Sequence, residues 1–332
     1  MKKFLTALLC AITAVIAVMG FTACGNNSDG ISVYMPDGAP ALAMAQLMSE
    51  NKDFGKKVNY HVVQAGEINS CVTYKKESKN ADLCILPVNA ASKLLGDGSR
   101  YKVLGTVTHG NLFILSGTDK ADLTAENIVE NLSGKKVGVV NFAAFPGAAT
   151  KLVMDKCGVN NVNLSGVDAT QVNGNESNYD YFVVPEPAAS TKIANANLNL
   201  KQAGSLQTLY GVGGYPQAVL VAKNSLIKSE PEFIAQFTAA MDKSAQWLLN
   251  ENTAAQTIFD AVKSHYADPE NTDPAFKVNN LTKSVIQNCA ISFEYAANCK
   301  EQIKAFLIEL KNVGDSTATE VSDSFFYIDT AI

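Results

Sequence analysis

Histidine, on which many catalytic and metal sites depend, is scarce in this sequence. The 332 residues include three histidines, His61, His109 and His265, which lie far apart along the chain. No His-Glu-x-x-His segment occurs, and no two cysteines have the Cys-x-x-Cys spacing of a zinc or redox site. We therefore expect no metal site. A structural role is favoured for His109, although its place between two predicted strands also allows a role in a ligand cleft.

Phosphate-binding loops are missing as well. Residues 211–214 read Gly-Val-Gly-Gly, but Pro216 follows and the next predicted element is a strand, whereas a dinucleotide loop opens a helix. Residues 134–136, Gly-Lys-Lys, lack the upstream glycine and the Ser or Thr of a nucleotide-binding P-loop. With no catalytic residue and no cofactor motif recognisable, we predict that the protein is not an enzyme.

Clustered positive charge, which a nucleic-acid partner would need, is also absent. The chain has 27 Lys and Arg residues against 32 Asp and Glu residues, so its formal net charge at pH 7 is −5. The basic residues are spread along the chain and form no patch in the sequence. We therefore expect no binding of DNA or RNA.

The cysteines do not form the pattern of a disulfide scaffold. Of seven in total, Cys10 and Cys24 belong to the N-terminal segment described next. The other five are Cys71, Cys84, Cys157, Cys289 and Cys299. An odd number leaves at least one thiol free or paired between molecules, which suits buried apolar cysteines or a reducing habitat. A bridge between Cys289 and Cys299 is left open.

The N-terminus has the features of an export signal. Lys2 and Lys3 precede a mainly apolar run, and Phe21-Thr22-Ala23-Cys24 resembles a lipobox, with Phe21 where leucine is usual. We predict a signal peptide over residues 1–23, lipidation of Cys24, and a polar tether over residues 24–30. The protein would then be anchored to a membrane on the extracytoplasmic side. The alternative is an uncleaved transmembrane helix, because the apolar stretch approaches the roughly 20 residues that cross a bilayer.

After residue 30 the pattern predicts an α/β protein with two lobes. Short strand-like runs alternate with helical patterns, which is typical of βαβ units and parallel sheets. A mature chain near 300 residues exceeds the usual size of a single core. We place lobe 1 at residues 31–110 and 216–332 and lobe 2 at residues 111–215. The chain then crosses between lobes twice, near residues 106–115 and 214–222, and these crossings would form a hinge.

Several helices are expected on pattern alone. One covers residues 67–76, another residues 124–132, and from residue 231 onward the chain reads as helical almost to its end. The predicted C-terminal helices cover residues 231–250, 253–264, 278–288 and 298–311. Residues 168–180 are poorly patterned and rich in Asn, and no element is predicted for residues 197–209.

Four turns that join a strand to a helix are the best candidates for a ligand site. They lie at residues 37–40, 87–90, 141–147 and 185–188, two in each lobe. Ligands of open α/β sheets bind outside the carboxyl ends of strands, where helix N-termini offer unpaired N–H groups. The candidate ligand-binding residues are Asp37, Gly38, Ala39, Asn89, His109, Phe142, Phe145, Glu186 and Tyr215. Ordinary helix capping explains each turn equally well when it is taken alone.

At these turns the sequence resembles a known family. The matching segments are Met35-Pro36-Asp37-Gly38-Ala39-Pro40-Ala41-Leu42-Ala43, Leu86-Pro87-Val88-Asn89-Ala90-Ala91, Val184-Pro185-Glu186-Pro187-Ala188-Ala189 and Tyr215-Pro216-Gln217. Together with the aromatic ending at residues 323–327, they resemble solute-binding lipoproteins of ABC transporters in the nitrate, sulfonate, taurine and thiamine-precursor class. The loop at residues 141–147 departs from the Gly-rich and polar loop of that class.

The resemblance implies a type II periplasmic-binding fold, a small-molecule solute held between the lobes, and a permease of an ABC importer as partner. We expect a monomer. The main alternative is an enzyme on the same fold that acts on a small organic substrate, because a fold does not fix an activity. The solute is either a small anion held by helix N-termini or a neutral or cationic heterocycle read by Asp37 and Glu186.

The predicted anchor gives a first test. Replacing Cys24 with alanine removes the thiol that would receive the lipid, so fatty-acid labelling of the protein in growing cells should be lost. The unsubstituted chain, labelled in parallel, is the control. Label retained in the Cys24→Ala variant would contradict the assignment.

Overall fold

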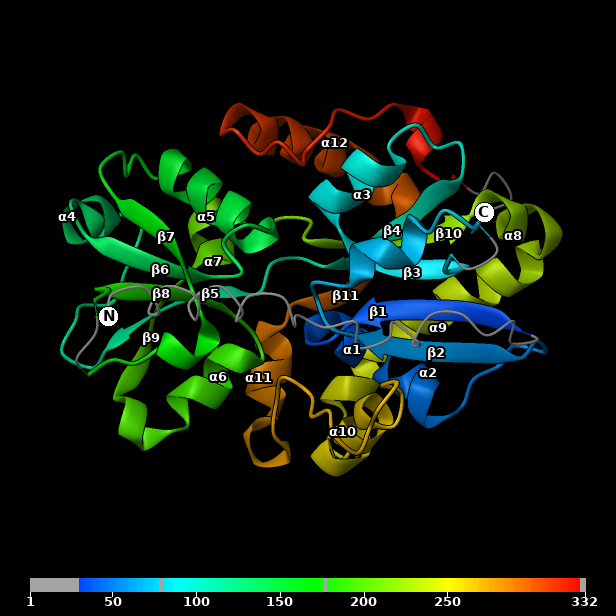
Figure 1. Cartoon of the computed structure of the whole chain (residues 1–332), viewed down its shortest axis with the longest axis horizontal. Helices are drawn as coiled ribbons and strands as arrows, with labels where there is room; N and C mark the ends of the chain where they lie inside the picture. Colours follow the sequence, from blue (N-terminus) through cyan, green and yellow to red (C-terminus); the bar gives the residue numbers. More distant parts are fainter. Residues whose placement is uncertain (1–29, 78–79, 176–177, 329–332) are drawn as a thin grey trace, which may run out of the picture.

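The chain forms two β-sheets, which lie at opposite ends of the long axis of the molecule (Figure 1). The computed structural model describes residues 30–77, 80–175 and 178–328. The first sheet has the strand order β11-β4-β10-β3-β1-β2, and the second has the order β7-β6-β8-β5-β9. The strands are β1 Ile31–Pro36, β2 Val58–Val63, β3 Leu83–Pro87, β4 Tyr101–Thr108, β5 Leu112–Gly117, β6 Lys136–Val140, β7 Asn163–Val167, β8 Tyr181–Pro185, β9 Leu200–Ser205, β10 Ala218–Lys223 and β11 Ile291–Tyr295.

The alternating pattern of strands and helices predicts mostly parallel sheets, but both sheets are mixed. In the first, β1 pairs parallel with β2 and β3, while β10 pairs antiparallel with β3 and β4. In the second, β6 pairs parallel with β7 and β8, while β5 pairs antiparallel with β8 and β9. Central strands such as β3 and β5 are buried along almost their whole length because helices cover both faces of each sheet. The predicted α/β fold class is confirmed.

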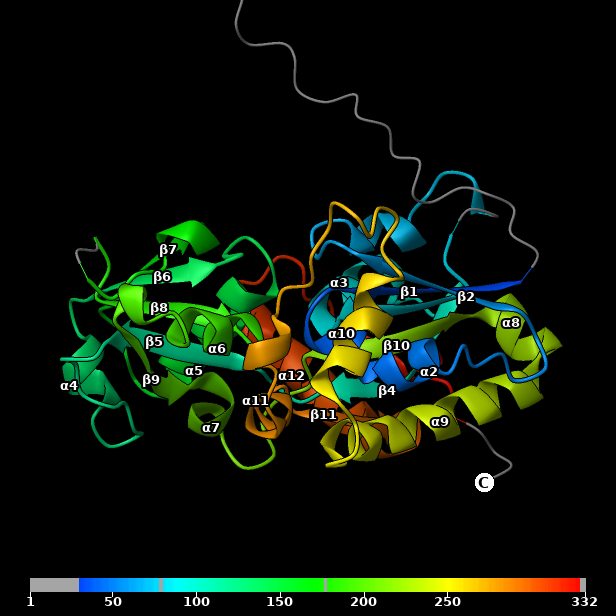
Figure 2. The ribbon, with the colours of Figure 1, turned by 90° about the horizontal axis from the view of Figure 1, so that it is seen from below.

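Helices cover the two sheets and the junction between them. Helix α3 lies on one face of the first sheet and α1, α2, α9 and α10 on the other, while α5 and α7 lie on one face of the second sheet and α6 on the other (Figures 1 and 2). The α-helices are α1 Ala39–Ala43, α2 Ala45–Ser49, α3 Val88–Leu95, α4 Ile128–Leu132, α5 Phe145–Lys156, α6 Ala188–Ile193, α7 Leu206–Tyr210, α8 Asn224–Ser229, α9 Pro231–Leu249, α10 Ala255–Lys263, α11 Lys283–Asn288 and α12 Ala296–Asn312.

Two segments carry the chain from one sheet to the other. The first joins the end of β4 at Thr108 to the start of β5 at Leu112, and the second joins α7 to β10 through residues 211–217. All described strands of the first sheet lie within residues 31–110 and 216–332, and those of the second lie within residues 111–215. Hereafter we call these two parts the first and second units.

Helix α12 forms a third connection between the units. It packs on α3 of the first unit and on α5 of the second. Its Phe306 is stacked on Tyr215 with ring centroids 5.5 Å apart, and Phe145 and Tyr210 surround the pair. As a result, one hydrophobic cluster runs without interruption from the first sheet to the second.

Three predictions about single elements are wrong. The expected helix over residues 67–76 is only the 3₁₀ turn η1 Ile68–Val72, and the helix over residues 124–132 begins at Ile128. The chain is not helical from residue 231 to its end, because β11 pairs antiparallel with β4 and residues 278–288 split into η5 Val278–Asn280 and α11. Strand β9 lies in a stretch for which no element is predicted. Both missed strands are short edge strands, for which pairing with a neighbour outweighs local propensity.

The remaining predictions concern the cysteines and the N-terminal segment. Among the described residues, Cys71, Cys84, Cys157, Cys289 and Cys299 form no disulfide, so Cys289 and Cys299 are not bridged. The predicted signal peptide, Cys24 and all of the tether except Gly30 lie outside the described residues. Among the residues that the structure does describe, no helix is long and apolar enough to span a membrane.

Candidate functional site

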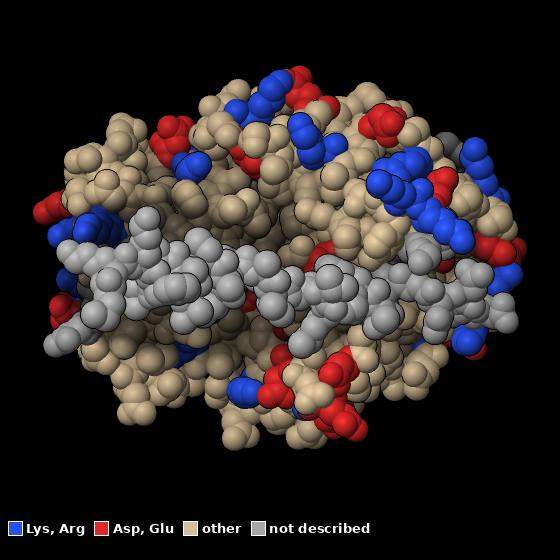
Figure 3. Space-filling view, viewed as in Figure 1, with Lys and Arg blue, Asp and Glu red and all other residues tan. Residues whose placement is uncertain are grey.

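The carboxyl ends of strands from both sheets face each other across the middle of the molecule. A Cβ atom placed on Gly38, just after β1, would lie 4.0 Å from Cδ of Pro187, just after β8. Because β3 runs parallel to β1 and β6 runs parallel to β8, the turns after β3 and β6 lie at the same two facing edges. The four turns predicted from the sequence therefore border one space, and Figure 3 shows a hollow between the two units.

The turn after β1 is fixed by its own aspartate. One carboxylate oxygen of Asp37 accepts a hydrogen bond from the Gly38 amide at 2.6 Å, and the other accepts one from the Ala275 amide at 2.8 Å. Burial raises the pKa of Asp37, while the nearby Tyr266 and the hydrogen bonds from these two amides oppose the rise. Gly38 has φ 95°, a conformation that residues with a side chain rarely adopt. Asp37 and the Gly38 amide thus already have partners within the protein.

The turn after β3 has a similar internal role. Asn89 is the second residue of α3, whose N-cap is Pro87, and the residue is 3 % exposed. Its amide group donates to a carboxylate oxygen of Asp315 at 2.9 Å and to the hydroxyl of Thr317 at 2.7 Å. Asn89 therefore holds a loop from the C-terminal part of the chain at the edge of the first sheet. The sequence offered no motif at Asp315 that would have revealed this contact.

The turn after β6 combines a strained backbone with an aromatic side chain. Asn141 has φ 59°, and a Cβ atom on Gly147 would lie 1.9 Å from the carbonyl oxygen of Phe142, so only glycine fits there. Phe142 is half-buried, and the ammonium of Lys151 lies 5.3 Å from its ring centroid. The partly exposed ring of Phe142 can therefore border the space between the units.

The turn after β8 holds the most deeply buried carboxylate among the predicted site residues. Glu186 is 2 % exposed. Its side chain accepts from the backbone amide and the hydroxyl of Ser190, at 2.9 and 2.6 Å, and from the side-chain amide of Asn288 at 3.4 Å. These contacts satisfy the first turn of α6 and join it to α11 of the first unit. Capping of α6 accounts for the two contacts with Ser190, and the contact with Asn288 links the two units.

The other predicted residues lie in or near the connections between the units. Phe145 and Tyr215 are almost fully buried in the aromatic cluster with Phe306, and burial raises the pKa of Tyr215. Ala39 is buried at the start of α1. His109 lies in the first crossing, where its Nε2 is 3.2 Å from the carbonyl oxygen of Ser292, and burial lowers its pKa.

Two residues that were not among the predicted ones join the crossings directly. The backbone amide of Asn111 donates to the side-chain oxygen of Gln217 at 3.0 Å, and the Gln217 amide donates back to the side-chain oxygen of Asn111 at 2.5 Å. Asn111 also exchanges two hydrogen bonds with the backbone of Glu186. A partly buried amide pair between two segments far apart in the sequence has no local signature from which it could be predicted.

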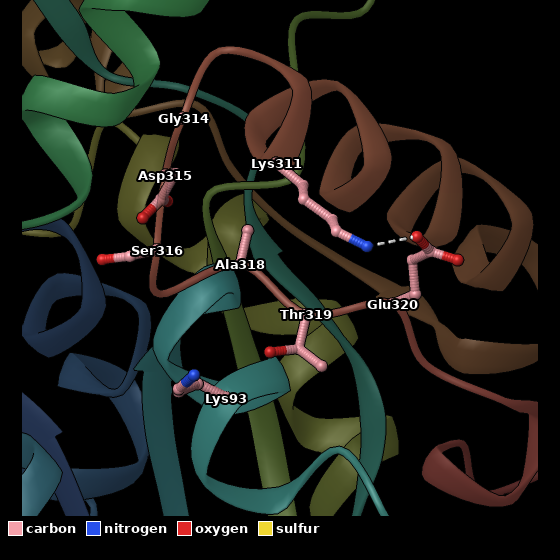
Figure 4. A pocket seen from close by; sticks show the side chains of 8 residues that line it. All are labelled: Lys93, Lys311, Gly314, Asp315, Ser316, Ala318, Thr319 and Glu320. Carbon is pink, nitrogen blue, oxygen red and sulfur yellow. Dashed lines mark hydrogen bonds and ion pairs between the residues drawn. The ribbon is translucent and has the colours of Figure 1, made fainter.

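A hollow of about 580 Å³ opens beside the turn after β3. Side chains of α3 and of the segment after α12 line it, and the ion pair between Lys311 and Glu320 closes one side (Figure 4). In the part of the chain that the structure covers, no three His, Cys, Asp or Glu side chains are grouped as metal ligands would be.

Comparison with known proteins identifies the family. The sequence model of a family described as "NMT1/THI5 like" matches residues 64–255, more than half of the chain. The chain belongs to the NMT1/THI5-like family. A search of curated protein sequences found no match. The predicted class of ABC-transporter solute-binding proteins is confirmed by this family match together with the structural neighbours that follow.

Solved structures share the fold of this family member at low sequence identity. An ABC transporter protein from Parabacteroides distasonis is 18 % identical with a TM-score of 0.70, over 90 % of this chain and 99 % of that one. The periplasmic aliphatic sulphonate-binding protein of Escherichia coli is 11 % identical with a TM-score of 0.64, over 90 % and 92 %. The periplasmic nitrate-binding protein of Synechocystis PCC 6803 is 12 % identical with a TM-score of 0.58, over 89 % and 83 %. The chain therefore has the periplasmic-binding-protein fold.

The contacts of Glu186 give a prediction about stability. In a Glu186→Gln variant, the side-chain NH₂ group would meet one of the donors that the carboxylate now accepts from, so the free energy of unfolding should fall by about 1–3 kcal/mol. Glu232→Gln, which removes an exposed carboxylate from the first turn of α9, should cost only about 0.3–1 kcal/mol. Urea denaturation measures both values. An equal fall in the free energy of unfolding of the two variants would contradict the capping role. Unchanged stability of Glu186→Gln together with weaker solute binding would instead mean that Glu186 contacts the solute.

Proposed function

We propose that the protein is the extracytoplasmic solute-binding component of an ABC importer. It captures a small organic solute in the space between the two units and delivers it to a permease. The observation that carries this proposal is the arrangement of four strand-to-helix turns, two from each unit, around a single hollow. The carboxyl edge of a sheet is where α/β proteins bind ligands, and here two such edges face each other.

The connections between the units suit a hinge. Residues 109–111 and 211–217 are the two crossings, and hinges are commonly a few residues between rigid elements. We infer that the lobes are residues 31–110 with 216–332 and residues 111–215, and that they approach each other when solute binds. The structural neighbours named for sulphonate and nitrate binding support this use of the fold.

The predicted site residues then divide into two groups. In our proposal, Gly38, Ala39, Asn89 and Phe142 border the solute, with Asp37 and Glu186 shaping the turns that meet it. Phe145, Tyr215 and His109 act at the hinge, because they pack within the connections between the units. The proposal assigns no catalytic residue, cofactor or metal to the protein.

Membrane attachment follows from the same proposal. An importer's binding protein must remain near its permease, and lipidation of Cys24 after removal of residues 1–23 would hold it on the outer side of the membrane. The tether would leave a monomeric two-lobed body free to meet the permease.

Solute binding is tested by stabilisation. A thermal-shift screen with sulfonates, nitrogen heterocycles and vitamin precursors should yield a compound that stabilises the folded protein, by about 2.7 kcal/mol at a concentration 100 times its dissociation constant. Incubating that compound with the protein should leave it chemically unchanged. Conversion of the compound into a product would instead support an enzyme on the same fold.

A further inference from the structure

Asp315, in the loop after α12, occupies a distinctive place beside the space between the units. Asn89 brings it to the start of α3, and α3 begins where β3 ends, at the edge that faces the second unit. Asp315 is half-buried, and it belongs to the wall of the 580 Å³ hollow. It is therefore a carboxylate at the same edge as the proposed solute-binding turns.

The carboxylate of Asp315 is fixed in position but not fully occupied. One oxygen accepts from the amide of Asn89, and the other accepts from the backbone amide and the hydroxyl of Thr317 at 2.8 and 2.6 Å. A carboxylate offers about four acceptor positions, so one remains after these three bonds. Asn89, a residue that is 3 % exposed, donates both of its side-chain amide hydrogens to this loop.

The side chain of Asp315 points away from the positive charges nearby. Figure 4 shows Asp315 and Ser316 projecting from one side of the loop, whereas Lys311 and Glu320 lie on its other side and Lys93 lies below it on α3. Ribbons of the second unit, in green, and of the first helices, in dark blue, border the side toward which Asp315 points (Figure 4). Lys311 is already paired with Glu320.

No arginine, the usual partner of an anionic solute, lies at the space between the units. Arg100 is the single arginine of the chain, and it donates to the carbonyl oxygen of Val72. It precedes β4, which runs parallel to β3 because both are antiparallel to β10, so Arg100 lies at the edge of the sheet away from the second unit. One lysine near the turns, Lys151, already has a partner, because its ammonium lies over the ring of Phe142.

We propose that Asp315 determines the charge class of the solute: it accepts a hydrogen bond from a positively charged amine or protonated ring nitrogen. The inference rests on the proposed solute-binding function and makes it more specific. Asn89 and Thr317 act as positioning residues that hold the carboxylate toward the space between the units. An anionic solute would meet this carboxylate as a like charge.

The test begins with the solute that the protein carries from its host. The full chain, purified under non-denaturing conditions, is examined by native mass spectrometry, and the released solute is identified and titrated back by calorimetry. We expect a solute that is cationic at pH 7. Asp315→Asn should weaken its binding by roughly ten- to a hundred-fold, because a hydrogen bond to a charged group is lost.

Two further measurements separate charge recognition from a structural effect. Salt weakens attraction between charges, so the affinity of the unsubstituted protein should fall with ionic strength, and the Asp315→Asn variant should show a flatter dependence. Asp242→Asn removes an exposed carboxylate of α9 and should leave both affinity and salt dependence unchanged. Thr317→Val, which loosens Asp315 without removing its charge, should weaken binding less than Asp315→Asn does.

The possible results separate two questions: whether Asp315 selects the charge of the solute, and whether the protein binds a solute at all. An anionic solute, or a cationic one that Asp315→Asn binds as tightly as the unsubstituted protein, would overturn the inference and leave solute binding intact. If no small molecule is carried or bound by the protein, the proposed function fails and the inference fails with it.

Discussion

The amide pair between Asn111 and Gln217 is the interaction on which the two-unit arrangement depends. These residues lie in the two crossings, 106 positions apart in the sequence, and their reciprocal hydrogen bonds hold the crossings side by side. Asn111 is 2 % exposed, so an unpaired amide here would cost the free energy of burying a polar group without a partner. The same residue binds the backbone of Glu186, which ties the turn after β8 to the hinge. The facing edges of the two sheets keep their alignment through these few bonds.

Helix α12 adds a second constraint of a different kind. Phe306 lies within an aromatic cluster that includes side chains of both units, and Glu309 binds Lys156 and the hydroxyl of Tyr210 at 3.1 and 2.8 Å. The ion pair is partly exposed and contributes little by itself, whereas the buried rings contribute through the apolar area they remove from water. Any relative movement of the units must therefore rotate about this cluster or slide along it, which limits the paths available to a closing motion.

Local signals in the sequence were enough to predict the α/β class, the alternation of strands and helices and the four strand-to-helix turns. Strand-like runs bounded by Pro, Gly and Asn carry that information. What the side chains of those turns do was less predictable. Glu186 and Asn89 resemble ligand-binding residues in the sequence, yet Glu186 binds Ser190 and Asn288, and Asn89 binds Asp315 and Thr317. Those partners, apart from Ser190, lie far away in the chain, and pairing over such separations leaves no periodic pattern to read. Strand β11 escaped prediction for the same reason.

The central claim is that the two units close on a solute, and a distance measured between them tests it most directly. Spin labels on Glu130→Cys in α4 and Lys228→Cys in α8 would lie at opposite ends of the molecule, with Cys157 replaced by serine to reduce labelling elsewhere. Pulsed electron resonance then gives the distribution of distances with and without a bound compound. The account predicts a shift to shorter distances when the protein is saturated with its solute. An unchanged distribution, with binding verified by calorimetry on the same labelled protein, would contradict it.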